Sequence, residues 1–184
     1  MAGSFEPDHI LSGASPRLAE RYYLFVPTGD SSWLALAIGI GIVAGLRSMT
    51  APAAVSWAAR VRWLHLEGTS LAFVGSWPAA VLFTVLALAE LVADKLPTTP
   101  NRTNPGPLAG RIVLGGFAAA CLTVAGGHSW LPGALAGGLG ALIGAFGGYH
   151  LRKRLVIRFG VRDLEVALFE DVLAVGLAWF LVSR

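Results

Sequence analysis

Charge is scarce in this sequence. Only 14% of its 184 residues are charged, whereas soluble domains carry about 25%. Hydrophobic residues make up 55% of the chain, and the mean hydropathy is +0.65. This balance is atypical of a soluble domain and favours a membrane protein.

Cysteine is nearly absent as well. The single Cys121 excludes an internal disulfide framework, and its apolar surroundings predict a small buried or lipid-facing residue. No HExxH, GxSxG, P-loop or clustered Cys/His ligand set is present. We therefore expect no enzymatic activity, no metal and no cofactor. Because the positive residues cluster at the ends of apolar runs, we interpret them as topology determinants and lipid-headgroup contacts, not as a nucleic-acid patch.

The N-terminal segment lacks the pattern of a cleaved signal peptide, a basic stretch followed by an apolar one. Residues 1–30 are polar and interrupted by Pro7, Pro16 and Pro27. We assign residues 1–32 to a tail, which either lies along the membrane surface through residues 18–26 or is floppy. Residues 33–184 form the expected transmembrane helical domain.

Long apolar runs are abundant. They predict an all-α bundle of about five spans, because a span needs about 20 apolar residues and open strands are not viable in lipid. Pro52 predicts a break or kink after the first span, and a short turn at His128 and Trp130 predicts an antiparallel hairpin of the third and fourth. The expected spans are 33–47, 71–94, 107–126, 131–151 and 164–182.

Positive residues predict the orientation of a multi-pass protein. The loop 152–162 is rich in them and is predicted to be cytoplasmic. The N-terminus falls on the same side if the first span crosses once. Arg60 and Arg62 then lie on the outer side, against the bias, unless the chain between Arg47 and Trp63 re-enters. Both alternatives stay open at this point.

Glycines recur along the fourth expected span. A spacing of four places Gly140, Gly144 and Gly148 on one helix face, where another helix can approach closely. That helix can belong to the same chain or to a second copy, and a glycine-lined pore is the alternative. The full set of candidate packing glycines is Gly133, Gly137, Gly140, Gly144 and Gly148.

Two segments combine basic side chains with a predicted helix start. In the first, Arg47, Ser48 and Thr50 precede "APAAVSWAA", a half-helix that Thr50 can cap. An arginine beside the N-terminus of a broken helix is typical of anion and substrate sites in transporters.

The second segment lies before the third span. Lys95, Arg102 and Arg111 surround the expected helix start, which Asn104 can cap. Positive charge and the helix dipole both favour an anion there.

Acidic residues form two further candidate groups. Glu90 and Asp94 share a helix face, and Glu170 and Asp171 lie in the last span; such groups can relay protons or hold a cation. The simpler interpretation is ion pairing, Arg47 with Glu90 and Arg111 with Asp94 or an acid of the fifth span. A weak internal repeat predicts Arg47–Glu90 and Arg111–Glu170 as equivalent pairs, because "AGLRS" at 44–48 parallels "LAGRI" at 108–112 and "ALAE" at 87–90 parallels "ALFE" at 167–170.

Three segments carry a family resemblance: "GLRSMTAPAAVSWAAR", "ELVADKLPTTPNRTNPGPLAGRI" and "GGLGALIGAFGGYHLRKRL" with "ALFEDVLA". Together they resemble a family of small bacterial integral membrane proteins classed as a domain of unknown function. The likeness covers residues 40–183, and "ELVADKLP" is its most specific part. The resemblance implies a bacterial inner-membrane protein and transfers no catalytic residue.

Three functions compete. The first is a small transporter, channel or lipid-handling protein with an intramembrane charged site for an anion or a proton-coupled solute. The second is an accessory structural subunit of a larger membrane complex. The third, an enzyme acting on a phospholipid or polyprenyl phosphate, lacks a nucleophile. We expect membrane lipids and a homo-oligomer or larger complex as partners, and no nucleic acid.

Overall fold

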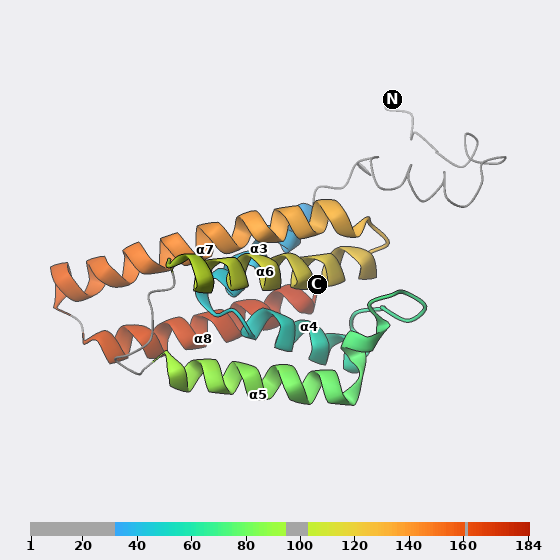
Figure 1. The fold of residues 1–184 in the computed structure, drawn as a ribbon, viewed down its shortest axis with the longest axis horizontal. Helices are drawn as coiled ribbons and strands as arrows, with labels where there is room; N and C mark the ends of the chain where they lie inside the picture. The colour runs from blue at the N-terminus through green and yellow to red at the C-terminus, as the bar shows by residue number, and fades with distance from the viewer. Residues whose placement is uncertain (1–31, 95–102, 161) are drawn as a thin grey trace, which may run out of the picture.

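The computed structural model describes residues 32–94, 103–160 and 162–184, and within these ranges the chain is all-helical, as predicted (Figure 1). The predicted tail, apart from Ser32, and the candidates Lys95 and Arg102 lie outside the described residues. The helices are α3 (Ser32–Leu46), α4 (Thr50–Arg60), the 3-10 helix η1 (Ala72–Gly75), α5 (Trp77–Ala93), α6 (Pro105–Ala125), α7 (Trp130–Phe159) and α8 (Asp163–Val182).

The helices run back and forth between two ends of an elongated bundle (Figure 1). At one end, which we call the aromatic end, the Trp33 ring lies 5.2 Å from His128 and the Trp63 ring 4.7 Å from Trp179, centroid to centroid. The opposite end holds the α3–α4 junction, the end of α5 and the starts of α6 and α8 (Figure 1). We call it the charged end, because the ion pairs described below lie there.

The chain breaks between α3 and α4, as Pro52 predicted, although the turn itself is at 47–49. Pro52 lies in the first turn of α4, where a missing N–H leaves no helical hydrogen bond unmade. The N-cap is Met49 without a side-chain cap, so the predicted capping by Thr50 is wrong. Because α4 runs back toward the aromatic end, Arg60 and the start of α3 lie at the same end (Figure 1). The chain between Arg47 and Trp63 therefore turns back. Arg60 still lies at the end opposite the 152–162 segment, and the start of α3 lies there too, which is opposite to the side predicted for the N-terminus. Re-entry of this segment into a membrane stays a prediction.

Helix α5 is shorter than expected and lies at the edge of the bundle. The segment expected at 71–94 is divided into η1 and α5 by Ser76, whose hydroxyl accepts from the Ala79 N–H at 3.3 Å. Trp57 fastens α5 to α4 by donating from Nε1 to Thr84 Oγ1 at 2.9 Å. Ala80 is the one buried residue of this helix.

Helix α7 is longer than expected. It continues past residue 151 to Phe159 and ends at Gly160, whose φ of 65° lies in the left-handed region that glycine adopts readily. The prediction of a loop over 152–162 is therefore wrong for most of its length. The connection to α8 is confined to residues 160–162.

Glycines bring α7 into close contact with α3 and α6. A Cβ atom added at Gly140 would lie 2.2 Å from the Ile38 carbonyl oxygen, and one at Gly144 would lie 2.2 Å from that of Ile42. On the α6 side, a Cβ at Gly137 would lie 2.4 Å from the Gly115 carbonyl oxygen. At Gly133 the added Cβ would meet a side chain instead, at 2.2 Å from Thr123 Oγ1. Gly148 is buried. These approaches are made within one chain.

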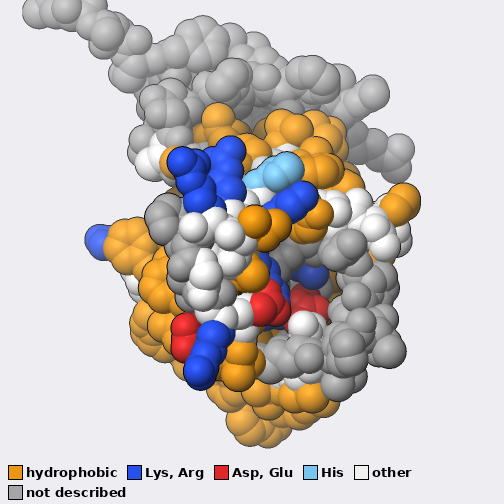
Figure 2. Space-filling view, turned by 90° about the vertical axis from the view of Figure 1, so that its left-hand side faces the viewer, with side chains coloured by type: hydrophobic (Ala, Val, Ile, Leu, Met, Phe, Trp, Pro, Cys, Tyr) orange, Lys and Arg blue, Asp and Glu red, His pale blue; other side chains and the backbone are white. Residues whose placement is uncertain are grey.

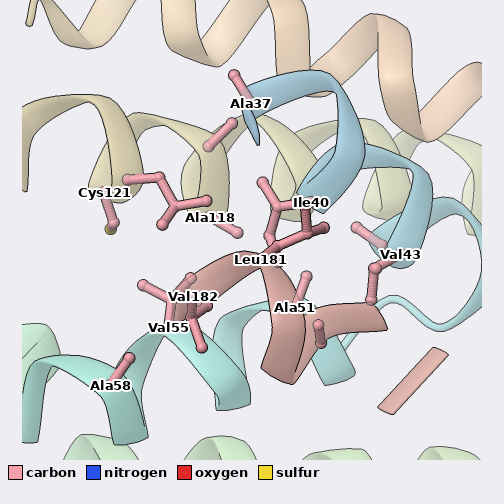
Figure 3. Packing of buried hydrophobic residues seen from close by; sticks show 14 of the residues in the cluster. Ala37, Ile40, Val43, Ala51, Val55, Ala58, Ala118, Cys121, Leu181 and Val182 are labelled. Carbon is pink, nitrogen blue, oxygen red and sulfur yellow. The ribbon is translucent and has the colours of Figure 1, made fainter. Parts of the chain in front are cut away.

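The remaining core lies where α3, α4, α6 and α8 meet (Figure 3). Ile40, Val55 and Leu181 meet there with many alanines. Cys121 is buried beside them. Small side chains allow the helices to pack closely, and this packing fixes the α3–α4 junction against α8.

Candidate functional site

Arg47 lies at the α3–α4 junction and is the centre of the charged site. It is 1% exposed, and its guanidinium forms ion pairs with Asp94, at the end of α5, and with Asp171 of α8. Its Nε–H has no hydrogen-bond acceptor among the described residues. One arginine thus joins three elements that are distant in sequence.

Glu90 binds the start of α4. Its carboxylate accepts hydrogen bonds from the Ser48 N–H at 2.8 Å, the Ser48 hydroxyl at 2.7 Å and the Met49 N–H at 2.8 Å. A carboxylate at this place is stabilised by the positive end of the helix dipole. The helix start at which we expected a bound anion is therefore occupied by a side chain of the protein.

Arg111 binds the other side of the junction, the end of α3. It is 5% exposed, and its Nη1 donates to the carbonyl oxygens of Gly45 at 3.3 Å and Leu46 at 3.2 Å, the last two residues of α3. A cation is favoured at this negative end of the helix. The same Nη1 lies 3.6 Å from Glu90 Oε1, so Arg111 and Glu90 bridge the break between the two helices.

The ion pairing of Arg47 differs from the sequence prediction. Arg47 pairs with Asp94 and Asp171 and not with Glu90, which lies closer to Arg111. The reason is that the two arginines are not structurally equivalent. Arg47 follows the last residue of α3, whereas Arg111 lies inside α6. The similarity of "AGLRS" and "LAGRI" therefore does not correspond to equivalent helix positions.

Within the described residues, the ion-paired site contains more acids than buried arginines. Three carboxylates, those of Glu90, Asp94 and Asp171, pair with Arg47 or Arg111, and Glu170 is buried next to Asp171 in the sequence of α8. The side chains of Glu90, Asp94 and Asp171 are 12%, 16% and 13% exposed. Figure 2 views this end of the molecule and shows acidic side chains near its middle, with basic side chains above them. Three partly exposed carboxylates around two buried arginines favour the uptake of a proton over the binding of an anion.

Three further candidate residues lie at or next to the starts of helices α4 and α6. Ser48 belongs to the site as a hydrogen-bond donor, while Thr50 is buried in the first turn of α4. Asn104 is the N-cap residue of α6, but its side chain makes no capping hydrogen bond. Within the described residues no group of three or more His, Cys, Asp or Glu side chains is arranged to hold a metal ion.

One ion pair was not predicted from the sequence. Arg152 of α7 donates to Asp163, the first residue of α8, from Nε at 2.8 Å and from Nη2 at 2.6 Å. The sequence signal for this pair was a basic residue, Arg152, before the helix-ending Gly160 and an acid, Asp163, soon after it. This bidentate pair holds the two helices together across their short connection.

Among the helices of the described ranges, two have the length and apolar composition to cross a membrane: α6, and Trp130–Arg158 of α7. Together with the broken helix and its charged junction, they define an all-helical protein with buried charge at one end of an apolar bundle.

The chain belongs to the family described as Domain of unknown function (DUF4126), whose model matches residues 34–183. The predicted resemblance to a family of unknown function is thereby confirmed. No curated protein and no solved structure matches the chain.

Proposed function

We propose that this protein is a small multi-pass transporter of the bacterial inner membrane, whose charged site at the α3–α4 junction binds and releases protons during transport of a solute. The observation that carries the proposal is the burial of Arg47 at a helix break, between carboxylates of α5 and α8.

The apolar surface supports a membrane location. Apart from α6 and α7, the shorter helices α3 and α5 are also apolar. Large hydrophobic side chains are exposed on several helices, including Val92 of α5 at 66%, Val113 of α6 at 68% and Val172 of α8 at 73%. Large apolar side chains exposed on several helices are unfavourable in water and are suited to lipid.

The buried charges are better explained by a functional role than by a contribution to the stability of the fold. A buried ion pair adds little net stability, because desolvation offsets the attraction. Ionisable groups inside membrane proteins usually mark substrate or proton pathways. Discontinuous helices are a recurring feature of transporter binding sites, and here the break lies beside Asp94 and Asp171.

The position of Glu90 argues against a free anion as the transported solute. Because its carboxylate occupies the α4 N-terminus, a free anion would have to displace it. Asp94 and Asp171 share the single guanidinium of Arg47, so protonation of one of them leaves Arg47 paired with the other. This arrangement can take up a proton or a cation without leaving the arginine uncompensated.

The experiment uses the full chain in proteoliposomes that contain a pH-sensitive dye. Proton entry is driven by a potassium diffusion potential set with valinomycin. We expect proton flux that is lost in Asp171→Asn and kept in Glu67→Gln, because Glu67 is 79% exposed near Arg62, away from the site. No flux above protein-free liposomes, or equal flux in both variants, would refute the proposal.

A second candidate is an accessory subunit of a larger membrane complex. The observation in its favour is α5, which buries only Ala80 and exposes large side chains on most of its surface. Copurification from native membranes distinguishes the two functions. A stoichiometric partner protein supports the subunit, and a bare chain or homo-oligomer supports the transporter.

A further inference from the structure

The end of α7 extends beyond the rest of the bundle (Figure 1). Helix α7 has 30 residues and its hairpin neighbour α6 has 21, so that α7 exceeds α6 by nine residues, or about 14 Å at 1.5 Å per residue. At the same rise α6 matches the roughly 30 Å hydrocarbon core of a bilayer. The excess of α7 therefore reaches the level of the lipid phosphates.

Basic side chains occupy this extension. Arg152, Lys153, Arg154 and Arg158 all follow residue 150. Helical spacing places His150, Arg154 and Arg158 on one face, with Lys153 next to them. All four of these side chains are exposed. We call His150, Lys153, Arg154 and Arg158 the basic face.

The helix that carries the basic face, α7, and its hairpin neighbour α6 contain no acidic residue. The sequence contains no Asp or Glu between Asp94 and Asp163. Asp163 pairs with Arg152, and within the described part of the chain Lys153, Arg154 and Arg158 form no ion pair. Figure 2 shows basic side chains and a histidine gathered above the acidic ones at the charged end. The positive charge of this face is thus available to an external anion.

We propose that the basic face binds the headgroups of acidic phospholipids. Their phosphodiesters lie at the level that the α7 extension reaches, and the charges are complementary. Leu151 and Ile157, exposed by 55% and 73% beside the basic side chains, provide apolar contacts for the adjoining lipid. Clusters of lysine and arginine at the cytoplasmic end of a span are the usual determinants of such binding.

This proposal rests on the membrane location in the proposed function, but not on proton transport. A lipid bound here would hold the α7–α8 connection at the membrane surface, next to the acidic site. Asp163 and Arg152 already tie that connection to the bundle.

The test measures lipids retained by the purified full chain. The protein is placed in nanodiscs of phosphatidylcholine with a minor fraction of phosphatidylglycerol, and bound lipids are counted by native mass spectrometry after transfer to detergent. We expect phosphatidylglycerol to be enriched roughly fivefold over its bulk fraction, about the change that one basic residue contributes near an anionic surface. Arg154→Gln/Arg158→Gln should lower the enrichment to near the bulk value.

The matched control is Arg60→Gln/Arg62→Gln, which removes two exposed arginines at the aromatic end and should keep the enrichment. Both leaflets of a nanodisc have the same composition, so a change of insertion direction cannot alter the result. Helical content by circular dichroism should be equal in both variants.

Three outcomes would overturn the proposal. The first is equal enrichment in both variants. The second is displacement of the lipid by excess inorganic phosphate, which would indicate a site for free phosphate. The third is retention of nucleic acid or an acidic protein on the basic face in place of lipid. Release of the chain from native membranes by alkaline carbonate would refute the membrane location itself, whereas an integral protein without lipid enrichment would refute only this proposal.

Discussion

The carboxylate of Glu90 and the guanidinium of Arg111 lie 3.6 Å apart at the break between α3 and α4. Glu90 accepts from the N–H groups at the start of α4, and Arg111 donates to the carbonyl groups at the end of α3. Each charge satisfies backbone groups that a broken helix leaves without partners. The break is therefore a stable feature of the fold, held by two opposite charges.

Glu90→Gln should destabilise the protein by about 1–2 kcal/mol, because charge-assisted hydrogen bonds at a helix start become neutral ones. Thermal unfolding in detergent, followed by circular dichroism, measures the change. Glu67→Gln is the control, since its exposed carboxylate lies 3.7 Å from Arg62 and should contribute little. Equal melting temperatures of Glu90→Gln and the wild type would contradict the capping role.

Arg47→Met should destabilise the protein more than Glu90→Gln, by about 3–5 kcal/mol, because it leaves Asp94 and Asp171 without their shared counter-charge. The triple variant Arg47→Met/Asp94→Asn/Asp171→Asn should recover part of this loss, since the uncompensated charges are removed too. The same unfolding assay tests both. A triple variant less stable than Arg47→Met would show that the three groups do not act as one unit.

Gly144→Leu should disrupt the contact of α7 with α3, since even its Cβ would lie 2.2 Å from backbone. Overpacking of this kind costs about 1–3 kcal/mol or more. A Cβ atom added at Gly147 on the same helix would meet nothing within 4 Å, so Gly147→Leu should be neutral or slightly stabilising because leucine favours helix. Yield and melting temperature of the two variants give the comparison. If both behave alike, close packing at Gly144 is not required.

The two ends of the bundle should lie on opposite sides of the membrane. In a Cys121→Ala background, a cysteine at the exposed position Lys153 should react with an impermeant maleimide only after cells are opened. A cysteine at Gly126, an exposed residue at the end of α6 with a φ of −83°, should react in intact cells. Ser32→Cys should follow Gly126→Cys, since α3 starts at that end. The same accessibility for Lys153→Cys and Gly126→Cys would contradict the orientation.

The sequence predicted most helices because apolar runs, prolines and glycines are local signals. Pro52 indicated the break, and the short segment near His128 indicated the α6–α7 hairpin. The end of α7 was missed because Arg152, Lys153 and Arg154 were interpreted as a loop. These residues are good helix formers, and no glycine or proline lies between Arg152 and Gly160.

The site was predictable in its members but not in its pairing. The structure brings the candidates Arg47, Glu90, Asp94, Arg111 and Asp171 together at one end. Which acid meets Arg47 depends on how α8 packs against the α3–α4 junction, and this packing is made by small residues distant in sequence. Charge neutralisation and the internal repeat both favoured Glu90 as the partner of Arg47, whereas the geometry of the turn at 47–49 directs Glu90 to the backbone.

Infrared difference spectroscopy tests the central claim most directly, because it detects protonation of a carboxylate in the charged site. The purified chain in lipid is switched between acidic and neutral buffer, and the carboxylic-acid C=O band is recorded. The account predicts a band in the wild type that is lost or shifted in Asp94→Asn and in Asp171→Asn and unchanged in Glu67→Gln. Identical spectra for the wild type and both site variants would show that the carboxylates around Arg47 do not exchange protons, and would contradict the account.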